Sequence, residues 1–329
     1  MKLFRKAFLL MFALVTIFSV AACQYETDTI VIGEGDWNSN RFYNQVVKYI
    51  LENGYDETVE VTSVSTPILI QSLTDGSIDL NIETWSDNMP TYQQDILDGN
   101  YVELGVNFDD NFQGIYIPQY LQDEHPDLVS ISDLANYKSL FPDPEVTGWD
   151  AENDKGVIYG GPSSWQVTTF FINKFANTDL YPELAANFEF RTLESTATLN
   201  STLTAAYESE EAWAGYNWEP TSIMGRYDMV LLEDDIAYDY DTGAGLIPTN
   251  NVTIVSTANF EEAHADAAAF LKLMHTSSAM VNEVLAYMDE QGLDPDEVAI
   301  WWLQNNESIW SAWVSDEALA KINTALDAE

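Results

Sequence analysis

The sequence is poor in the residues that bind metals and form disulfides. Its 329 residues include one cysteine and three histidines. A single cysteine excludes a disulfide within the chain and a cysteine-based zinc site, and the spacing of His125, His264 and His275 matches no metal-ligand pattern. We therefore expect neither a metal site nor a cofactor.

Positive charge is scarce as well. Lys and Arg total 12 against 54 Asp and Glu, which gives a formal net charge of -42. Such a charge repels a phosphate backbone and excludes nucleic acid as a partner. The acidic excess is typical of an exported protein kept soluble by its surface, although a field that steers a cationic ligand would need the same residues. With 46% hydrophobic residues, the chain can bury a sizeable core. Its length predicts about two domains, at ~150 residues each.

The first 22 residues predict a signal peptide. Three basic residues, Lys2, Arg5 and Lys6, precede an apolar stretch of 14 residues at 7–20. This stretch is too short to span a bilayer comfortably, which argues against a transmembrane helix. We therefore expect residues 1–22 to be removed during export.

The end of this segment predicts a lipid anchor. Val20-Ala21-Ala22-Cys23 resembles a bacterial lipobox, in which the cysteine becomes the lipidated N-terminus, and residues 23–28 then form a lipid-anchored tether. The alternative is an ordinary signal peptide cleaved near Ala22. The prediction is an extracytoplasmic protein anchored to the bacterial cell envelope, in the periplasm or on the outer face of the cell membrane.

Alternating strands and helices predict an α/β fold. Strands are expected at 29–33, 59–64 and 78–82, with helices at 40–51 and 67–74 between them. The order β-α-β-α-β predicts a parallel sheet, whose ligands bind at the carboxyl ends of its strands.

A second unit is predicted to begin near residue 114. It contains expected strands at 114–118, 157–160 and 213–217, and after a strand at 252–255 the chain is expected to be helical almost to its end. We therefore predict two lobes with a ligand cleft between them. Residues 29–113 and 251–329 form the first lobe, and residues 114–250 form the second.

Two segments resemble the start of an enzyme motif, but neither motif is complete. Gly33-Glu34-Gly35 follows a strand, but the third glycine of a dinucleotide fingerprint is replaced by Asn38. Gly161-Pro162-Ser163-Ser164 lacks the pattern of a nucleophile elbow. We therefore expect no enzymatic activity and assign no catalytic residue.

Four tryptophans each follow a predicted strand: Trp37, Trp85, Trp165 and Trp218. In that position they would converge on the cleft, where indole faces attract an alkylated ammonium by up to ~2 kcal/mol each when desolvated. The alternative is that they are packing residues. A predicted C-terminal amphipathic helix is expected to bury another four in the core: Trp301, Trp302, Trp310 and Trp313.

Several short motifs follow one another in a characteristic order along the mature chain. They are Gly35-Asp36-Trp37, Gly76-Ser77-Ile78-Asp79 before Trp85, Gly114-Ile115-Tyr116-Ile117-Pro118, Ile158-Tyr159-Gly160 before Trp165, Trp218-Glu219-Pro220 and Val298-Ala299-Ile300-Trp301-Trp302-Leu303. On these residues the chain resembles the substrate-binding proteins of glycine betaine/choline/proline betaine ABC transporters. The resemblance implies the two-lobed periplasmic-binding-protein fold of type II.

The resemblance also implies ligand-binding residues. In the glycine betaine branch the cage tryptophans match Trp85, Trp165 and Trp218, and backbone amides matching Gln166 and Val167 hold the ligand carboxylate. In the choline branch the cage matches Trp37, Trp85 and Trp218, with an aromatic at Tyr116. That branch has an acid where this chain has Ser39, so glycine betaine is favoured.

The implied partners are a small quaternary ammonium ligand, an ABC permease with its ATPase, and the membrane through the lipid anchor, with the protein as a monomer. Choline, carnitine, proline betaine, dimethylsulfoniopropionate and trimethylamine N-oxide remain alternative ligands. A tethered sensor or a secreted enzyme is the alternative function. Because indoles and backbone amides do not titrate near neutrality, ligand affinity is expected to be nearly flat from about pH 6 to 9.

Overall fold

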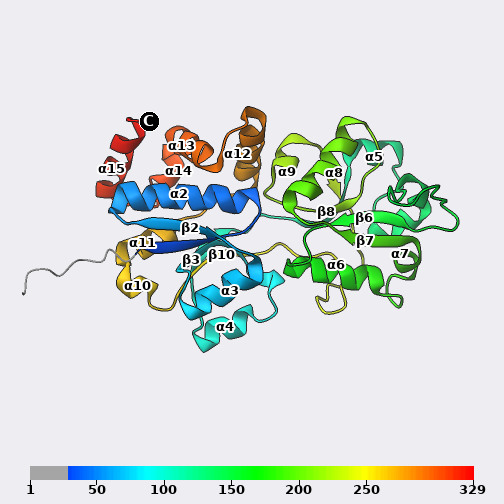
Figure 1. Ribbon diagram of the computed structural model, residues 1–329, viewed down its shortest axis with the longest axis horizontal. Helices are drawn as coiled ribbons and strands as arrows, with labels where there is room; N and C mark the ends of the chain where they lie inside the picture. Colours follow the sequence, from blue (N-terminus) through cyan, green and yellow to red (C-terminus); the bar gives the residue numbers. More distant parts are fainter. Residues whose placement is uncertain (1–28) are drawn as a thin grey trace, which may run out of the picture.

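The computed structural model describes residues 29–329 and arranges them as two α/β lobes side by side (Figure 1). The predicted signal peptide and tether, including Cys23, lie outside the described residues. The strands are β1 (Ile30–Glu34), β2 (Val59–Ser63), β3 (Leu80–Trp85), β4 (Val102–Phe108), β5 (Gln113–Pro118), β6 (Gly156–Gly160), β7 (Phe188–Thr192), β8 (Gly215–Trp218), β9 (Met229–Leu231) and β10 (Val252–Ser256).

Helices surround both sheets. They are α2 (Asn38–Tyr55), α3 (Thr66–Asp75), α4 (Tyr92–Asp98), α5 (Gln119–Glu124), α6 (Gln166–Ala176), α7 (Pro182–Asn187), α8 (Thr196–Glu208), α9 (Ser222–Arg226), α10 (Phe260–Ala263), α11 (Ala265–Leu273), α12 (Ser278–Gln291), α13 (Pro295–Asn305), α14 (Glu307–Trp310) and α15 (Asp316–Leu326), with 3-10 turns η1 (Ser86–Asn88) and η2 (Ile131–Leu140). In the residues described, none of these helices is both long and apolar enough to cross a membrane.

The three strands predicted to be parallel, β1, β2 and β3, run in parallel, but the complete sheet of the first lobe is mixed. Its strand order is β2-β1-β3-β10-β4. β1 runs parallel to β2 and β3, whereas β10 is antiparallel to both β3 and β4. The difference arises because β10 enters this sheet from the opposite direction, after the chain has passed through the second lobe.

The second sheet has the order β7-β6-β8-β5-β9. The chain reaches it between β4 and β5 and leaves it between β9 and β10. The two crossing segments are joined to each other: the Asn111 Nδ2 donates to the Asn250 carbonyl at 2.7 Å, and the Asn250 N–H donates to the Asn111 Oδ1 at 3.1 Å. These bonds hold both connections between the lobes at one place.

Helix α2 forms because one of its faces is apolar and covers the first sheet. Phe42, Tyr43 and Ile50 on this face are fully buried. The helix does not stop at Gly54 as predicted but continues to Tyr55. Gly54 is retained inside the helix because α15 packs on it so closely that a Cβ there would lie 3.0 Å from the Ile322 Cδ1.

The C-terminal tryptophans do not all behave as predicted. Trp302 and Trp310 are 1% and 0% exposed, and Trp313 is also buried. Trp301 is only partly buried and stacks on Tyr287, with 4.0 Å between ring centroids. Helix α13 ends at Asn305, so the four do not share one helix. Neighbouring helical residues such as Trp301 and Trp302 point about 100° apart, and therefore only one of them can face the core.

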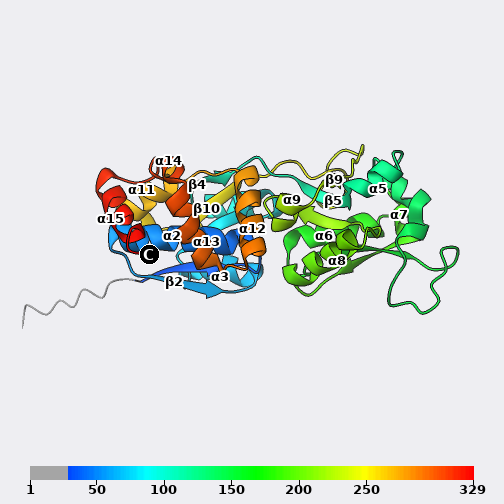
Figure 2. The same ribbon diagram turned by 90° about the horizontal axis from the view of Figure 1, so that it is seen from above.

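The lobes also meet through α9 and α12, which lie side by side in both views (Figures 1 and 2). The Thr221 N–H donates to the Asn282 Oδ1 at 2.7 Å. Gly225 approaches the same helix so closely that a Cβ would lie 2.2 Å from the Asn282 carbonyl oxygen. This seam fixes the two lobes next to the chain crossings, and the ends of β3 and β8 face each other beside it.

Candidate functional site

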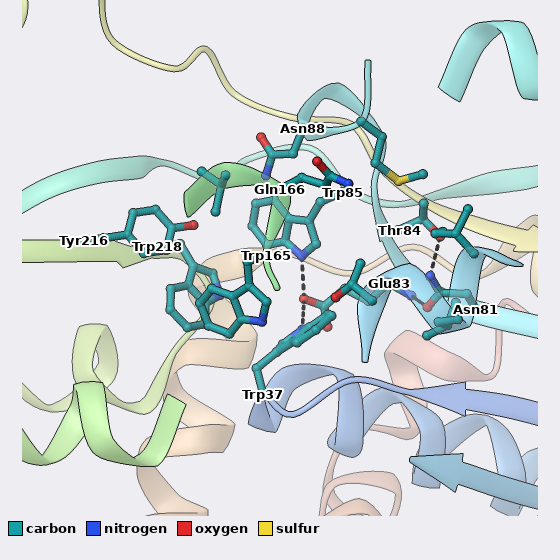
Figure 3. A pocket seen from close by; sticks show the side chains of 15 residues that line it. Trp37, Asn81, Glu83, Thr84, Trp85, Asn88, Trp165, Gln166, Tyr216 and Trp218 are labelled. Atoms are coloured by element: carbon teal, nitrogen blue, oxygen red, sulfur yellow. Dashed lines mark hydrogen bonds between the residues drawn. The ribbon is translucent and has the colours of Figure 1, made fainter. Parts of the chain in front are cut away.

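A small cavity of about 70 Å³ lies between the lobes. Residues of both lobes line it, and Figure 3 shows their side chains converging from the two sides. The structure brings six of the seven predicted ligand-binding residues to this one cavity: Trp37, Trp85, Trp165, Gln166, Val167 and Trp218.

Each of the four cavity tryptophans stands at the end or start of a regular element. Trp37 precedes α2 and Trp85 is the last residue of β3, both in the first lobe. Trp165 precedes α6 and Trp218 is the last residue of β8, both in the second lobe. We call these four residues the tryptophan cluster. Their positions follow from the α/β pattern, in which strand ends and the turns after them border the cleft.

Three rings of the tryptophan cluster are in contact, and one of the two contacts, between Trp37 and Trp165, crosses the cleft. Trp37 and Trp165 meet edge to face, with centroids 6.1 Å apart, and Trp165 meets Trp218 in the same way at 5.1 Å. The Trp165 Nε1 also donates to the Asp36 Oδ1 of the first lobe at 3.2 Å. Trp37, Trp165 and Trp218 are only 8%, 9% and 4% exposed. The two lobes therefore touch at the cavity.

Tyr116, the seventh predicted residue, does not line this cavity. It lies inside β5 opposite Gly215 and Leu231 and is buried in the core of the second lobe. The aromatic that does line the cavity is Tyr216, which stacks on Trp218 with 5.5 Å between centroids. The sequence prediction missed Tyr216 because strand pairing, which the sequence does not show, decides which face of β8 and β5 meets the cleft.

The prediction also missed Glu83, a buried carboxyl group at the centre of the site. Glu83 is 1% exposed, and its Oε1 accepts hydrogen bonds from the Trp37 Nε1 at 2.8 Å, the Trp85 Nε1 at 3.0 Å and the Ser39 Oγ at 3.0 Å. Figure 3 shows the carboxyl group between the two indole nitrogens. Its Oε2 is buried and has no hydrogen-bond partner among the described residues. The available signal was an acid inside an otherwise uncharged buried strand, two residues before a tryptophan.

Burial controls the protonation of Glu83. Loss of hydration raises its pKa to about 8, while the hydrogen bonds from Trp37, Trp85 and Ser39 oppose the rise by stabilising the charged form. The carboxyl group is therefore mostly protonated at neutral pH. The expectation that affinity is flat from pH 6 to 9 assumed a site without titrating groups, and Glu83 removes that basis.

The second lobe offers a different polar feature. Gln166 and Val167 are the first two residues of α6, and the first N–H groups of a helix have no acceptor within the helix. Together with the helix dipole they favour an anionic group at this end of the cavity. Among residues 29–329, no Lys or Arg lines the cavity, so an anionic group there would have to be bound by hydrogen-bond donors such as these N–H groups rather than by a basic side chain.

The described residues offer little for metal chemistry. Across 29–329, no three His, Cys, Asp or Glu side chains are grouped in a way that could hold a metal ion. The chemistry available at the cavity is therefore aromatic contact, hydrogen bonding and the proton of Glu83.

Comparison with known proteins matches this chain to a family of transport proteins. The family model of the substrate binding domain of ABC-type glycine betaine transport systems matches residues 28–305. A trimethylamine N-oxide-binding protein of Pelagibacter ubique is 23% identical over 328 residues, covering 93% of this chain and 98% of that protein.

Solved structures show the same architecture. A glycine betaine/L-proline-binding protein from Borrelia burgdorferi aligns with a TM-score of 0.70 at 21% identity, covering 90% of this chain and 100% of that one. An ABC-transporter choline binding protein in complex with choline aligns with a TM-score of 0.70 at 18% identity, covering 91% and 98%. These likenesses confirm the predicted two-lobed fold of the type II periplasmic binding proteins.

Proposed function

We propose a ligand and a role for this chain from the premise that it belongs to the family of substrate-binding domains of ABC-type glycine betaine transport systems. In this role it captures a small methylated ammonium zwitterion, glycine betaine first, and delivers it to an ABC permease and its ATPase. It acts as a transport component rather than an enzyme. The observation that carries the proposal is that two indoles from each lobe line one cavity.

The tryptophan cluster suits a methylated ammonium group for a physical reason. The charge of such a group is spread over its methyls, which are apolar and cannot donate N–H hydrogen bonds. Indole faces offer both apolar contact and an electrostatic attraction of up to ~2 kcal/mol each in a desolvated site. Because the four rings come from both lobes, a bound head group bridges the lobes and stabilises their contact.

The polar groups favour a ligand without net charge. An isolated cation would need an ionised partner in the cavity, and Glu83 is mostly protonated at neutral pH. A free anion would need a cation, and no Lys or Arg of the described chain lines the site. A zwitterion avoids both requirements, since its carboxylate can accept hydrogen bonds from the N–H groups of Gln166 and Val167 at the start of α6 and from a protonated Glu83.

Trimethylamine N-oxide is the second candidate. The cavity is small, and a relative that spans nearly the whole chain binds this compound. Its oxygen is attached directly to the methylated nitrogen, so a group beside the head, such as Glu83, would have to bind it. Choline, carnitine, proline betaine and dimethylsulfoniopropionate complete the set of ligands to compare.

We further propose that the lobes divide near residues 113 and 250, with Gln113 already part of β5 in the second sheet. We also propose that the mature protein is an extracytoplasmic, lipid-anchored monomer. Cys23, the only cysteine, is the proposed anchor. Cys23→Ser should release the protein from the membrane fraction or leave it unprocessed, because the acyl chains supply the attachment. Membrane association that is unchanged in this variant would contradict the anchor.

Binding of a ligand panel tests the proposed function. Native mass spectrometry of the purified protein should detect a co-purified methylated ammonium compound, and calorimetric titration should rank glycine betaine or trimethylamine N-oxide first. The recovered ligand should be chemically unchanged. Failure of the whole panel to bind would overturn the proposal, and chemical conversion of a ligand would favour an enzyme instead.

A further inference from the structure

We infer that Glu83 recognises the ligand's anionic oxygen: a proton on its Oε2, which is buried without a partner beside the cavity, is donated in a hydrogen bond to a carboxylate or amine-oxide oxygen near the methylated nitrogen. The inference rests on the proposed function, because it gives one residue of that site the role of selecting zwitterions over cations with the same head group.

The two oxygens of Glu83 are in different situations. Three donors, the Trp37 Nε1, Trp85 Nε1 and Ser39 Oγ, all converge on Oε1. Oε2 is buried without a partner among the described residues, and Glu83 lines the cavity. A buried polar atom left unpaired costs about 1–3 kcal/mol. A ligand in the cavity is therefore the natural partner of Oε2.

The chemistry of the ligand determines which proton makes this bond. A fully methylated ammonium has no N–H and cannot donate to Oε2. A carboxylate or amine oxide is an acceptor only, so a hydrogen bond with Glu83 requires the proton to be on the Glu83 carboxyl group. Neutral Glu83 and a zwitterion therefore complement each other, whereas a cation without oxygen would leave Oε2 unpaired.

The described groups packed around Glu83 contain no charge that would ionise it. From α2 and its start come Trp37, Ser39 and Tyr43, and burial raises the pKa of Tyr43 well above its usual range. From the second lobe, Tyr216 faces the same cavity, and burial raises its pKa well above its usual range as well. Both phenols stay neutral over the range where Glu83 titrates.

On the two strands that flank β3 in the described sheet, the residues that pair with β3 carry no charge. β1 pairs with β3 at Ile32, and β10 pairs with it at Val252, Thr253, Val255 and Ser256. Burial therefore dominates, and it raises the pKa of Glu83 to about 8. The neutral form is available at physiological pH without help from a neighbouring charge.

Opposite pH dependences follow for the two kinds of ligand. A zwitterion that needs the Glu83 proton loses affinity as pH rises above 8, approaching tenfold per pH unit. A cation that needs the Glu83 carboxylate gains affinity as pH rises and reaches its full affinity once the pH is above the Glu83 pKa of about 8. Trimethylamine N-oxide and tetramethylammonium form a matched pair for this comparison, because they differ by an oxygen in place of one methyl group.

The experiment is calorimetric titration of the full chain from pH 6 to 9.5 with these two compounds and with glycine betaine. Between pH 7.5 and 9.5 the affinity for trimethylamine N-oxide and glycine betaine should fall roughly 10- to 30-fold, while that for tetramethylammonium rises or stays level. In Glu83→Gln the pH dependence should disappear for all three. Glu219→Gln is the matched control, because Glu219 is another carboxyl group whose pKa burial raises but which does not line the cavity, and it should keep the wild-type profiles.

Ser39→Ala provides a second variant in case Glu83→Gln does not fold. It removes one donor to the Glu83 Oε1 and so raises the pKa further, which should move the loss of zwitterion affinity to higher pH. Zwitterion binding that is independent of pH in the wild type, or a pH dependence that persists in Glu83→Gln, would overturn the inference and leave the proposed function intact. Failure of all three compounds to bind at any pH would overturn both.

Discussion

The two lobes hold their halves of the tryptophan cluster by different means. In the first lobe, Trp37 and Trp85 both donate their indole N–H to Glu83. In the second lobe, Trp165 and Trp218 pack edge to face, and Tyr216 stacks on Trp218. The first half is therefore positioned by a titrating carboxyl group and the second by aromatic contact. We therefore expect pH to act on this site through Glu83 of the first lobe.

One hydrogen bond links the two halves of the tryptophan cluster and involves neither Glu83 nor a ring contact. The Trp165 Nε1 of the second lobe donates to the Asp36 Oδ1 of the first. Asp36 directly precedes Trp37, so the bond brings the start of α2 to the start of α6. We therefore expect the distance between the lobes and the positions of Trp37 and Trp165 to depend on each other.

The largest expected effect separates the tryptophan cluster from the core. Trp302→Ala removes a side chain that is 1% exposed and should lower the free energy of unfolding by about 3–5 kcal/mol, because it leaves a cavity. The affinity of the folded variant for glycine betaine should stay nearly unchanged. Denaturant unfolding and calorimetric titration measure the two quantities. Trp301→Ala is the control, since the partly buried Trp301 should cost less stability.

Two single variants, each lacking one indole from a different lobe, test whether the two halves of the tryptophan cluster both bind the ligand. Trp85→Ala and Trp218→Ala should each weaken betaine binding by about 1.5–3 kcal/mol, or roughly 10- to 150-fold, because each removes one face and admits water. We expect the larger loss for Trp85→Ala, which also removes a donor to Glu83. If Trp218→Ala lowers the melting temperature as much as Trp302→Ala while it binds betaine normally, the cluster is packing rather than a binding site.

The stability of the protein should depend on pH through Glu83. Between the ordinary pKa of 4.5 and the raised value of about 8, the folded protein retains a proton that the unfolded chain has released. Stability contributed by Glu83 is therefore complete below this window and is lost as pH rises through it, by at most about 1.4 kcal/mol per pH unit.

Urea unfolding of the wild type and Glu83→Gln at pH 5, 6.5 and 8 measures this contribution. The wild type should lose stability relative to the variant as pH increases, because the amide introduced by Glu83→Gln does not titrate. Parallel stability curves for the two proteins would mean that Glu83 has an ordinary pKa.

The smallest expected effect concerns the bond between the halves. Asp36→Ala removes the acceptor of the Trp165 Nε1 and should weaken ligand binding by about 0.5–1.5 kcal/mol, or roughly 2- to 12-fold. Asp36→Asn keeps a carbonyl oxygen in the same place and should bind more tightly than Asp36→Ala. Equal affinity of both variants and the wild type would show that this bond does not contribute to the bound state.

The sequence by itself determined the architecture and the location of the indoles. Alternating strands and helices predict α/β lobes, and the residues that follow strands border the cleft of such a fold. Trp37, Trp85, Trp165 and Trp218 could therefore be chosen from local pattern alone, although β3 and β8 extend to Trp85 and Trp218 rather than ending before them. The mixed sheet could not be predicted, because the direction of β10 depends on the path of the chain through the other lobe.

Only the tertiary structure decided the chemistry of the site. Glu83 has a raised pKa because folding buries it, and the hydrogen bonds that limit this rise come partly from Trp37 and Ser39, 46 and 44 residues away in the sequence. Tyr216 lines the cavity in place of Tyr116 because of the pairing of β5 with β8. Burial and strand register are properties of contacts between distant segments, whereas strand ends and helix starts are local. For this reason the tryptophans of the site could be predicted from the sequence, whereas Glu83, the group expected to titrate, was found only in the tertiary structure.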